Sequence, residues 1–269
     1  MDVRAAAVAG IFYPGESSEL SRSIQALFAD ATGANPWLGP PKALIVPHAG
    51  YIYSGPIAAS AYAPLARLRG IIERVVLLGP AHHLALTGLA LPGASAFDTP
   101  LGRVRVDAEA AGLLRSLAGV SVNPAAHVRE HAIEVQLPFL QQVLGTFRII
   151  PLAVGHATAE AVAEAIEALW GGLETLIIVS SDLSHYLPYE RAQAMDRRTC
   201  ASISDLEPLA SHEQACGATA VNGLLLAARR HGLRPHLMDL RNSGDTAGDR
   251  SHVVGYAAFA FTQEGARAH

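Results

Sequence analysis

Short runs of aliphatic residues recur along the chain, and each ends abruptly at a turn-forming residue or at a histidine. Continuous runs of this kind are typical of strands buried on both faces of a sheet, because neither face then has to be polar. Four runs predict central strands, at Ala43–Val46, Val75–Leu78, Ile149–Val154 and Leu176–Val179. A fifth apolar run near the C-terminus, Val253–Phe261, predicts another strand.

Segments with a helical pattern lie between these strands. Apolar residues recur at helical spacing within Leu20–Phe28, and Ser17 and Ser18 just before them could cap this helix. An alanine-rich run, Ala157–Leu169, predicts a second helix, and Ala218–Arg230 predicts a third. Strands that alternate with helices predict an α/β fold with three layers, αβα, around a mixed and largely parallel central sheet.

The chain contains no internal repeat, low-complexity tract or Pro/Gly-rich linker that would divide it. We therefore expect a single domain over residues 1–269, with a core of about residues 5–262. Only the tail after Thr262 is expected to be loose.

Composition narrows the classes of partner. Lys and Arg total 20 against 24 Asp and Glu, so a formal net charge of -4 offers no basic field to nucleic acid or an anionic membrane. No apolar stretch approaches the roughly 18 residues of a membrane span, and Met1–Gly10 is too short and too acidic for a signal peptide. Two cysteines are too few for a disulfide framework. We therefore expect a cytoplasmic protein with reduced thiols, bound neither to nucleic acid nor to membranes.

Histidines follow the predicted strands. His48 follows the first strand, His82 and His83 the second, His156 the third and His185 the fourth. In open α/β sheets the ligand binds beyond the carboxyl ends of the strands. These histidines are therefore expected to converge on one rim of the sheet.

A single histidine after a strand is more often a turn residue or a structural hydrogen-bonding group than a metal ligand. Four such strand ends favour the other interpretation, in which His48 and either His82 or His83 bind one metal ion, because neutral imidazole is the commonest transition-metal ligand. Adjacent side chains diverge, so only one histidine of that pair is expected to face the metal. His156 is left out of the site, because it can simply satisfy backbone groups at the start of the next helix.

Cys216 lies directly before the predicted helix Ala218–Arg230. A thiol at a helix N-terminus has a lowered pKa, because the thiolate meets the positive end of the dipole, and it can be a metal ligand or a nucleophile. The alternative is a small buried apolar residue, as most free cysteines are. Cys200 has no such setting and is interpreted as structural.

Two further segments are candidates for the walls of the site. His127–Glu134 lacks the register of a zinc-protease motif, which needs a glutamate directly after the first histidine. It is expected to begin a helix that runs through Leu137, with His131 lining the site or helping to bind substrate. The Gly/Asp-rich segment Asn242–Asp249 is interpreted as a solvated turn, with a place in a pocket wall as the alternative.

Several sequence blocks together resemble those of one family. In chain order they are Ala9–Tyr13, Pro47–Tyr51, Leu78–His83, Glu130–Glu134, Ser180–His185 and Ala215–Gly217. They resemble the Memo family, whose microbial members are called AmmeMemoRadiSam system protein B. The resemblance runs in order from about Ala9 to Phe259, and the Pro-His-Ala-Gly-Tyr and Ser-Asp-x-x-His blocks are specific in combination.

That family is similar in fold to the β subunits of class III extradiol ring-cleaving dioxygenases, which use non-haem Fe(II). The resemblance implies that His48, His82 and Cys216 are the metal ligands and that Asp182 and His185 lie beside the metal. The dioxygenases have a glutamate where this family has a cysteine. A soft thiolate suits Fe, Cu or Zn differently from a carboxylate, so the resemblance implies the fold and the site more securely than the reaction.

Three functions follow from this set of residues. The first is a dioxygenase-type oxidoreductase with one transition-metal ion, Fe(II) rather than Cu or Zn, in which His185 is the general acid/base. Asp182 would orient either His185 or a metal ligand. The second is a metal-handling or peptide-binding module without turnover, which holds an extended partner near Phe12 and Tyr13. The third is a zinc hydrolase.

The expected partners are a small-molecule or peptide ligand and other proteins of the AmmeMemoRadiSam system. Residues expected to contact the ligand are Phe12, Tyr13 and His131.

Overall fold

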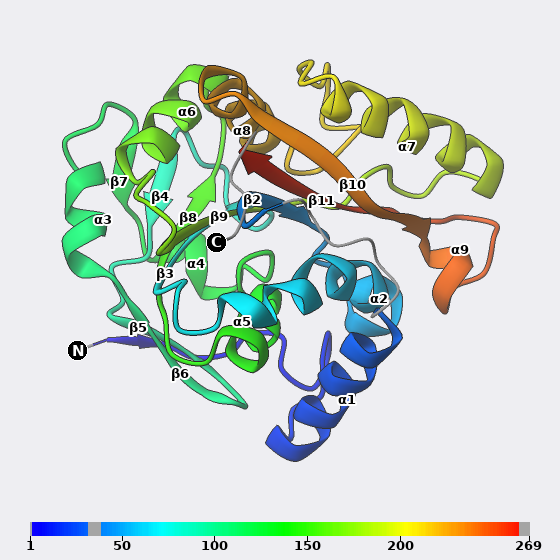
Figure 1. Cartoon of the computed structure of the whole chain (residues 1–269), viewed down its shortest axis with the longest axis horizontal. Coiled ribbons are helices and arrows are strands. Elements are labelled where there is room, and N and C mark those ends of the chain that lie inside the picture. The colour runs from blue at the N-terminus through cyan, green and yellow to red at the C-terminus, as the bar shows by residue number, and fades with distance from the viewer. Residues whose placement is uncertain (1, 32–38, 264–269) are drawn as a thin grey trace.

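A computed structural model describes residues 2–31 and 39–263 of the chain. The described residues form an 11-stranded sheet with helices on both faces (Figure 1). In chain order, the strands are β1 (Val3–Arg4), β2 (Pro41–Val46), β3 (Arg74–Pro80), β4 (Leu89–Leu91), β5 (Ala96–Thr99), β6 (Gly102–Val106), β7 (Val120–Val122), β8 (Arg148–Val154), β9 (Thr175–Ser180), β10 (Leu233–Asn242) and β11 (Gly255–Gln263).

The helices vary from one turn to more than four. They are α1 (Ser17–Asp30), α2 (Tyr51–Tyr62), α3 (Ala108–Leu114), α4 (Ala125–Val128), α5 (Leu137–Leu144), α6 (Ala159–Ala168), α7 (Tyr189–Ser204), α8 (Ala218–Arg230) and α9 (Ser243–Thr246), with 3₁₀ turns η1 (Ala63–Leu68) and η2 (Glu134–Gln136). Among the described residues, no helix combines the length and the apolar character that crossing a membrane requires.

The four predicted central strands are confirmed as β2, β3, β8 and β9. They lie side by side in the order β8, β3, β9, β2, and each neighbouring pair is parallel. Beyond β2, the antiparallel strands β11 and β10 complete that side of the sheet. The predicted mixed and largely parallel sheet is therefore confirmed.

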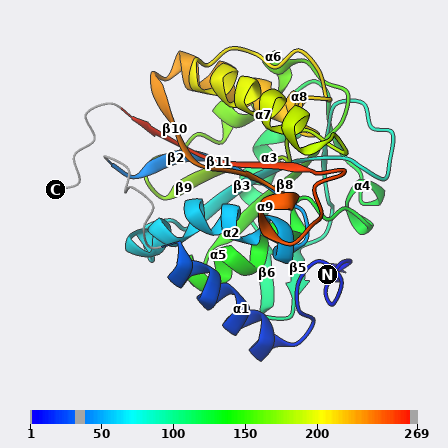
Figure 2. The ribbon, with the colours of Figure 1, turned by 90° about the vertical axis from the view of Figure 1, so that its right-hand side faces the viewer.

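Two hydrophobic cores lie on opposite faces of this sheet. In β2, Ala43 and Ile45 belong to one core, and Leu44 and Val46 belong to the other, as the alternation of side chains along a strand requires. Helices α6 and α8 cover the first face, and α1, α2 and α5 cover the second, as Figure 2 shows. Cover on both faces explains why the central strands are apolar throughout.

The predicted helices are confirmed as α1, α6 and α8, but the predicted caps of α1 are wrong. Ser17 and Ser18 lie inside the helix, and its N-cap is Glu16, whose side chain makes no capping hydrogen bond. The expected tail after Thr262 lies outside the described residues apart from Gln263, which ends β11.

The helix expected to begin within His127–Glu134 starts only at the last residue of that segment, where η2 opens at Glu134 and runs directly into α5 at Leu137. Helix α4 ends at Val128, and turns follow until η2 begins. The two glutamates of this segment explain the break, because tertiary contacts occupy their side chains. Glu130 accepts a hydrogen bond from the backbone N–H of His82, and Glu134 accepts one from that of Ala7.

Candidate metal centre

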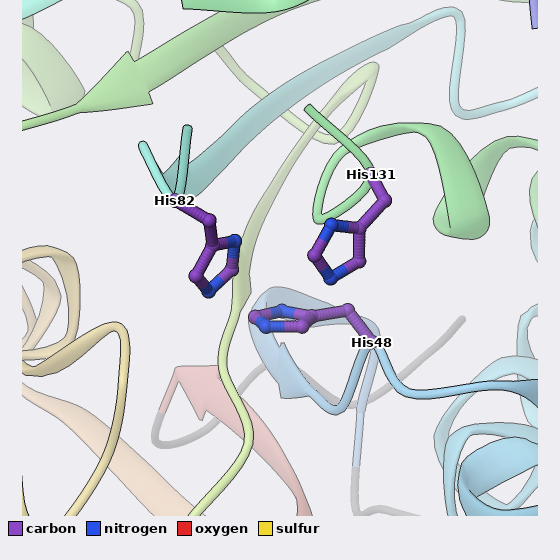
Figure 3. A group of neighbouring side chains, drawn as sticks. All are labelled: His48, His82 and His131. Carbon is purple, nitrogen blue, oxygen red and sulfur yellow. The ribbon is translucent and has the colours of Figure 1, made fainter. Parts of the chain in front are cut away.

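Three histidines from separate segments converge at one rim of the sheet. His48 follows β2 and His82 follows β3, while His131 comes from the turns between α4 and η2. One ring nitrogen of each lies within 4.8 Å of the others. Figure 3 shows the rings of His82 and His131 side by side, each with a nitrogen directed toward His48. The expected meeting of His48 and His82 is therefore present, and His131 joins them.

The three rings pack directly against one another. His82 and His131 are stacked, with ring centroids 4.8 Å apart and planes 18° apart. The ring of His48 stands nearly perpendicular to both, at 5.2 Å from His82 and 5.5 Å from His131. His83 lies outside this group, with its ring centroid 6.1 Å from that of His131. The expectation that only one histidine of the pair faces the site agrees with this arrangement.

The tautomer of His48 follows from the hydrogen bonds around Ser180. Ser180 Oγ lies 2.7 Å from the carbonyl oxygen of Ala132, which can only accept, so the hydroxyl donates there. Gln136 Nε2 donates to Ser180 Oγ over 2.8 Å. His48 Nδ1, 2.9 Å from Ser180 Oγ, must therefore be the protonated nitrogen. Nε2 of His48 keeps its lone pair, as a metal ligand requires.

Glu130 fixes His82 in the same tautomer. Oε1 of Glu130 lies 2.9 Å from His82 Nδ1, and Oε2 accepts the His82 backbone N–H over 2.6 Å. Burial raises the pKa of Glu130, but hydrogen bonds from His82 and from the backbone of Ala132 outweigh it and lower that pKa to about 2. An ionised carboxylate can only accept, so His82 donates from Nδ1, and the lone pair of the neutral ring lies on Nε2. Carboxylates commonly hold metal-binding histidines in this way.

The imidazoles of His48 and His131 are neutral near pH 7. Burial, together with the nearby His82, lowers the pKa of His48 to about 3. Burial and the neighbouring His48 lower the pKa of His131 to about 4. Neutral imidazole is the form that binds a metal ion.

Cys216 contacts His48 but is not among the described residues that line the cavity. Its Sγ is 3.3 Å from His48 Nε2 and 3.3 Å from the backbone nitrogen of Asp182. Because His48 Nε2 carries a lone pair, the thiol is the donor. Among the described residues, the group of mutually close ligand atoms contains the three histidines and does not extend to Cys216.

The expected lowering of the Cys216 pKa is wrong. Burial and the nearby carboxylate of Asp182 raise this pKa to about 12. Gly217 is the N-cap of α8, and Cys216 lies one residue before this cap. Loss of hydration here outweighs the helix dipole, and the thiol is protonated in the metal-free protein.

Asp182 and His185 both reach the site from the segment after β9. Asp182 is 4% exposed, and its Oδ1 accepts the backbone N–H of His48 over 2.7 Å. Burial raises the pKa of this carboxyl. His185 Nδ1 donates to the carbonyl of Leu183 over 2.8 Å, so the lone pair of the neutral ring lies on Nε2. Of the two roles expected for Asp182, its hydrogen bond therefore supports orientation of a candidate ligand, while Leu183 holds His185.

A segment near the N-terminus packs over the histidines. The ring of Phe12 contacts that of His131, with centroids 4.8 Å apart. Tyr13 is buried, and its hydroxyl donates to Glu134 Oε1 over 2.5 Å. Glu134 also forms a buried ion pair with Arg4. The hydroxyl of Tyr13 is thus committed to the protein, whereas Phe12 presents its ring to the site.

The histidines lie against a cavity of about 1310 Å³. Every predicted site residue except Cys216 lines it: Phe12, Tyr13, His48, His82, His131, Asp182 and His185. His156, which was left out of the site, is not among the described lining residues. The solvated turn expected for Asn242–Asp249 is wrong, because this segment contains α9 and supplies Ser243, Gly248 and Asp249 to the wall.

Sequence reasoning missed three residues that support the histidines. Ser180 and Glu130 lie within blocks that resemble the family, so those blocks carried a signal for them. Gln136, which is fully buried and also donates to the carbonyl of Pro47, had no signal in the sequence.

The donor set fits a transition-metal ion. His48 and His82 are each held by a partner on Nδ1, which places the lone pair of the neutral ring on Nε2. The thiol of Cys216 lies within reach of His48 and adds a soft donor. Histidine and thiolate donors suit Fe, Cu or Zn better than Mg or Ca, which prefer oxygen.

Comparisons with known proteins agree with the resemblance. The sequence model of the Memo-like protein family matches residues 4–260. A MEMO1 family protein of Aeropyrum pernix is 39% identical and covers 96% of this chain and 99% of its own length. One of Ignicoccus hospitalis is 38% identical, with 97% and 99% covered. The crystal structure of an uncharacterized protein of Escherichia coli K12 is similar in fold, with a TM-score of 0.52, 14% identity and 80% and 98% covered.

Proposed function

This chain belongs to the Memo family, and on that premise we propose that it binds one transition-metal ion through His48, His82 and His131. The convergence of three imidazoles at the floor of a large cavity carries the proposal. In this proposal Cys216 joins the three histidines as a thiolate when the metal displaces its proton. Binding a cation lowers the pKa of a coordinating thiol, so the protonated thiol of the metal-free protein is no obstacle.

The function that this centre supports best is redox chemistry of the extradiol dioxygenase type with Fe(II). An iron ion held on one side would activate oxygen and polarise a bound substrate. The chain's own groups supply the proton transfers. His185 lines the cavity and its Nδ1 is held by the carbonyl of Leu183, so in the neutral ring Nε2 can accept a proton from a substrate hydroxyl. Asp182 holds the backbone of His48 in place while this happens.

Metal identity and ligands are tested on protein purified without oxygen. Elemental analysis identifies the metal, and a Co(II) titration reports the donors by absorption. We expect a thiolate-to-cobalt band in the wild type and in His131→Ala, and its loss in Cys216→Ala. We also expect His131→Ala to weaken metal affinity at least about tenfold, because even an outer partner can contribute that much. An unchanged affinity in His131→Ala would return His131 to the substrate-binding role that the sequence predicts.

Oxygen uptake by the Fe(II)-loaded protein tests the reaction. Consumption of oxygen with a catechol, lost in His185→Gln by about a hundredfold or more while the metal content is kept, supports dioxygenase chemistry. Metal that stays bound without any oxygen uptake would instead support a metal-handling module.

A further inference from the structure

The charges that face the cavity are unbalanced. Its described lining contains the acidic residues Glu19, Asp182 and Asp249, and none of the described lining residues is Lys or Arg. Glu19 and Asp249 are exposed. Hydrogen bonds from Ser251 lower the pKa of Asp249, so it is ionised at neutral pH. An anionic ligand would therefore meet carboxylates and find no guanidinium or ammonium partner.

The N-terminus of α2 also lines the cavity, and a helix N-terminus favours an anion. Its first backbone N–H is already used, because Tyr51 donates to the carbonyl oxygen of Phe12 over 2.8 Å. The N–H groups of Tyr53 and Ser54 both donate to Gly50. The positive end of this helix is thus largely satisfied within the protein.

Aromatic side chains form much of the remaining wall. Tyr53, Tyr186 and Tyr256 line the cavity in addition to Phe12. Tyr256 is 2% exposed and lies at the wall of the cavity. Burial and the nearby carboxylate of Asp182 raise the pKa of Tyr256, so its hydroxyl stays protonated. A protonated phenol hydroxyl at the wall of a cavity can donate a hydrogen bond to an acceptor on a ligand.

Tyr186 supports the same conclusion from its backbone. It has a φ of 57°, in the left-handed region that a bulky residue rarely adopts, and it is 72% exposed. Because the ring of Tyr186 is exposed, its packing does not compensate for this backbone strain in the free protein. Strain of this kind is concentrated at binding sites, where a ligand completes the packing. The ring lies 5.9 Å from that of His185, at the cavity.

The proposal that follows from these observations extends the proposed function, and it depends on that function for the position of the metal. We propose that the cavity binds an aromatic ligand with its oxygen-bearing end at the histidines and an uncharged or cationic outer end. Ligands with a carboxylate or phosphate at the outer end bind more weakly. A bound divalent metal would change the electrostatic potential at the histidine end of the cavity, near His48 and Asp182. The selection by charge therefore resides in Glu19 and Asp249, away from the candidate ligands.

Binding of three ring-matched probes to the metal-free protein tests this selection by calorimetry. Tyramine, tyrosol and 4-hydroxyphenylacetate share a phenol ring and carry a cationic, neutral and anionic tail, respectively. Because a unit-charge contact near 4 Å in water contributes about 1 kcal/mol, we expect the anion to bind at least about fivefold more weakly than tyrosol. Tyramine should bind at least as tightly as tyrosol. Added salt should reduce the differences in affinity between the charged probes and tyrosol.

Matched variants assign the effect to the named groups. Glu19→Gln with Asp249→Asn should reduce the preference for tyramine over 4-hydroxyphenylacetate by about fivefold and leave tyrosol binding unchanged. Glu164→Gln, at an exposed acid on α6 on the opposite face of the sheet, should change nothing. Tyr256→Phe should weaken all three probes alike.

Two results would overturn the inference: no binding of any probe, or 4-hydroxyphenylacetate binding as tightly as tyrosol. Elemental analysis is a separate readout. A protein that takes up no metal but still selects the probes by charge would contradict the proposed function and leave the ligand class standing.

Discussion

At the scale of single residues, the Ser180 hydroxyl decides which nitrogen of His48 is free. It donates to Ala132 and accepts from both Gln136 and His48, so all three of its hydrogen-bonding positions are filled. Without it, the imidazole could protonate on Nε2 and lose the lone pair that faces the site. Ser180 is therefore a positioning residue for the candidate metal ligand.

We predict that Ser180→Ala lowers the free energy of unfolding by about 2 kcal/mol or more, because it leaves buried donors and an acceptor without partners. Metal affinity should fall about 10- to 100-fold, as for other partners behind a ligand. Ser184 is a matched control, since it is equally buried and its Oγ has no hydrogen-bond partner among the described residues. Chemical denaturation and metal titration of both variants measure the effects. Equal losses in Ser184→Ala would contradict the role of Ser180.

A second prediction concerns the pH dependence of stability. Burial raises the pKa of Asp196 from 3.8 to about 6, against a hydrogen bond from the backbone of Ser184 that lowers it. The folded protein therefore holds a proton that the unfolded chain has already lost. This contribution to stability is full below about pH 4 and disappears as the pH rises through about 6.

Asp196→Asn should remove this dependence. The difference in unfolding free energy between wild type and variant should change by up to about 3 kcal/mol between pH 4 and pH 7, since each pKa unit corresponds to about 1.4 kcal/mol. Denaturation at several pH values measures it. Parallel pH profiles for the two proteins would show that Asp196 titrates normally in the folded state.

The sequence identified the histidines better than their supporting residues. His48, His82 and His185 each follow a buried apolar run, so the position of each at the rim follows from the strand before it. His131 follows no strand, and the segment that carries it reaches the rim through long-range contacts of Glu130 and Glu134. The pKa of Cys216 depends on burial by the whole fold, which the local helix start does not report.

At the scale of secondary-structure elements, the close packing of α6 against α8 depends on Gly223. A Cβ at this position would lie 2.3 Å from Val162 Cγ1 of α6. Glycine is unfavourable within a helix by about 1 kcal/mol relative to alanine, so its presence in α8 needs a packing reason. Contact between the two helices provides that reason.

We predict that Gly223→Ala lowers the free energy of unfolding by about 1–3 kcal/mol, as overpacking of a core does. Gly112 in α3 is the matched control, because a Cβ there meets no atom within 4 Å. Gly112→Ala should stabilise by about 0.5–1 kcal/mol through helix propensity alone. Val162→Ala combined with Gly223→Ala should lose less than the sum of the two single changes. Additive losses would rule out the contact as the cause.

The predicted elements were those with a strong periodic or continuous pattern. Strands β2, β3, β8 and β9 are apolar because both of their faces are covered, so each appears in the sequence as a continuous run of apolar residues. Strand β10, at the edge of the sheet, mixes charged and apolar residues and was not predicted. The short strands β4 and β7 have three residues each, too few for periodicity to show.

At the scale of the whole molecule, one buried ion pair joins the N-terminal segment to the site. Arg4 and Glu134 are 5% and 0% exposed, and Glu134 also accepts hydrogen bonds from the backbone of Ala7 and Val8. The same carboxylate holds the hydroxyl of Tyr13. The pair thereby fixes the segment that brings Phe12 against His131.

Arg4→Met should lower the free energy of unfolding by about 3–5 kcal/mol, because Glu134 would remain buried without its partner. The segment before Tyr13 should also become sensitive to limited proteolysis. Arg103→Met breaks the exposed pair with Asp98 and should leave the free energy of unfolding nearly unchanged, because water screens exposed ion pairs. A similar, small effect of both changes would mean that the N-terminal segment is held by other contacts.

The metal centre itself is tested most directly by the binding stoichiometry of the purified protein, measured by calorimetric titration with a divalent transition metal. The geometry of the three histidines predicts one tight site per chain, with affinity reduced at least about tenfold in His48→Ala and in His82→Ala. His83→Ala, one residue along the chain but outside the group, should bind like the wild type. A wild type that takes up no metal, or an affinity that is unchanged in both His48→Ala and His82→Ala, would contradict the proposed centre.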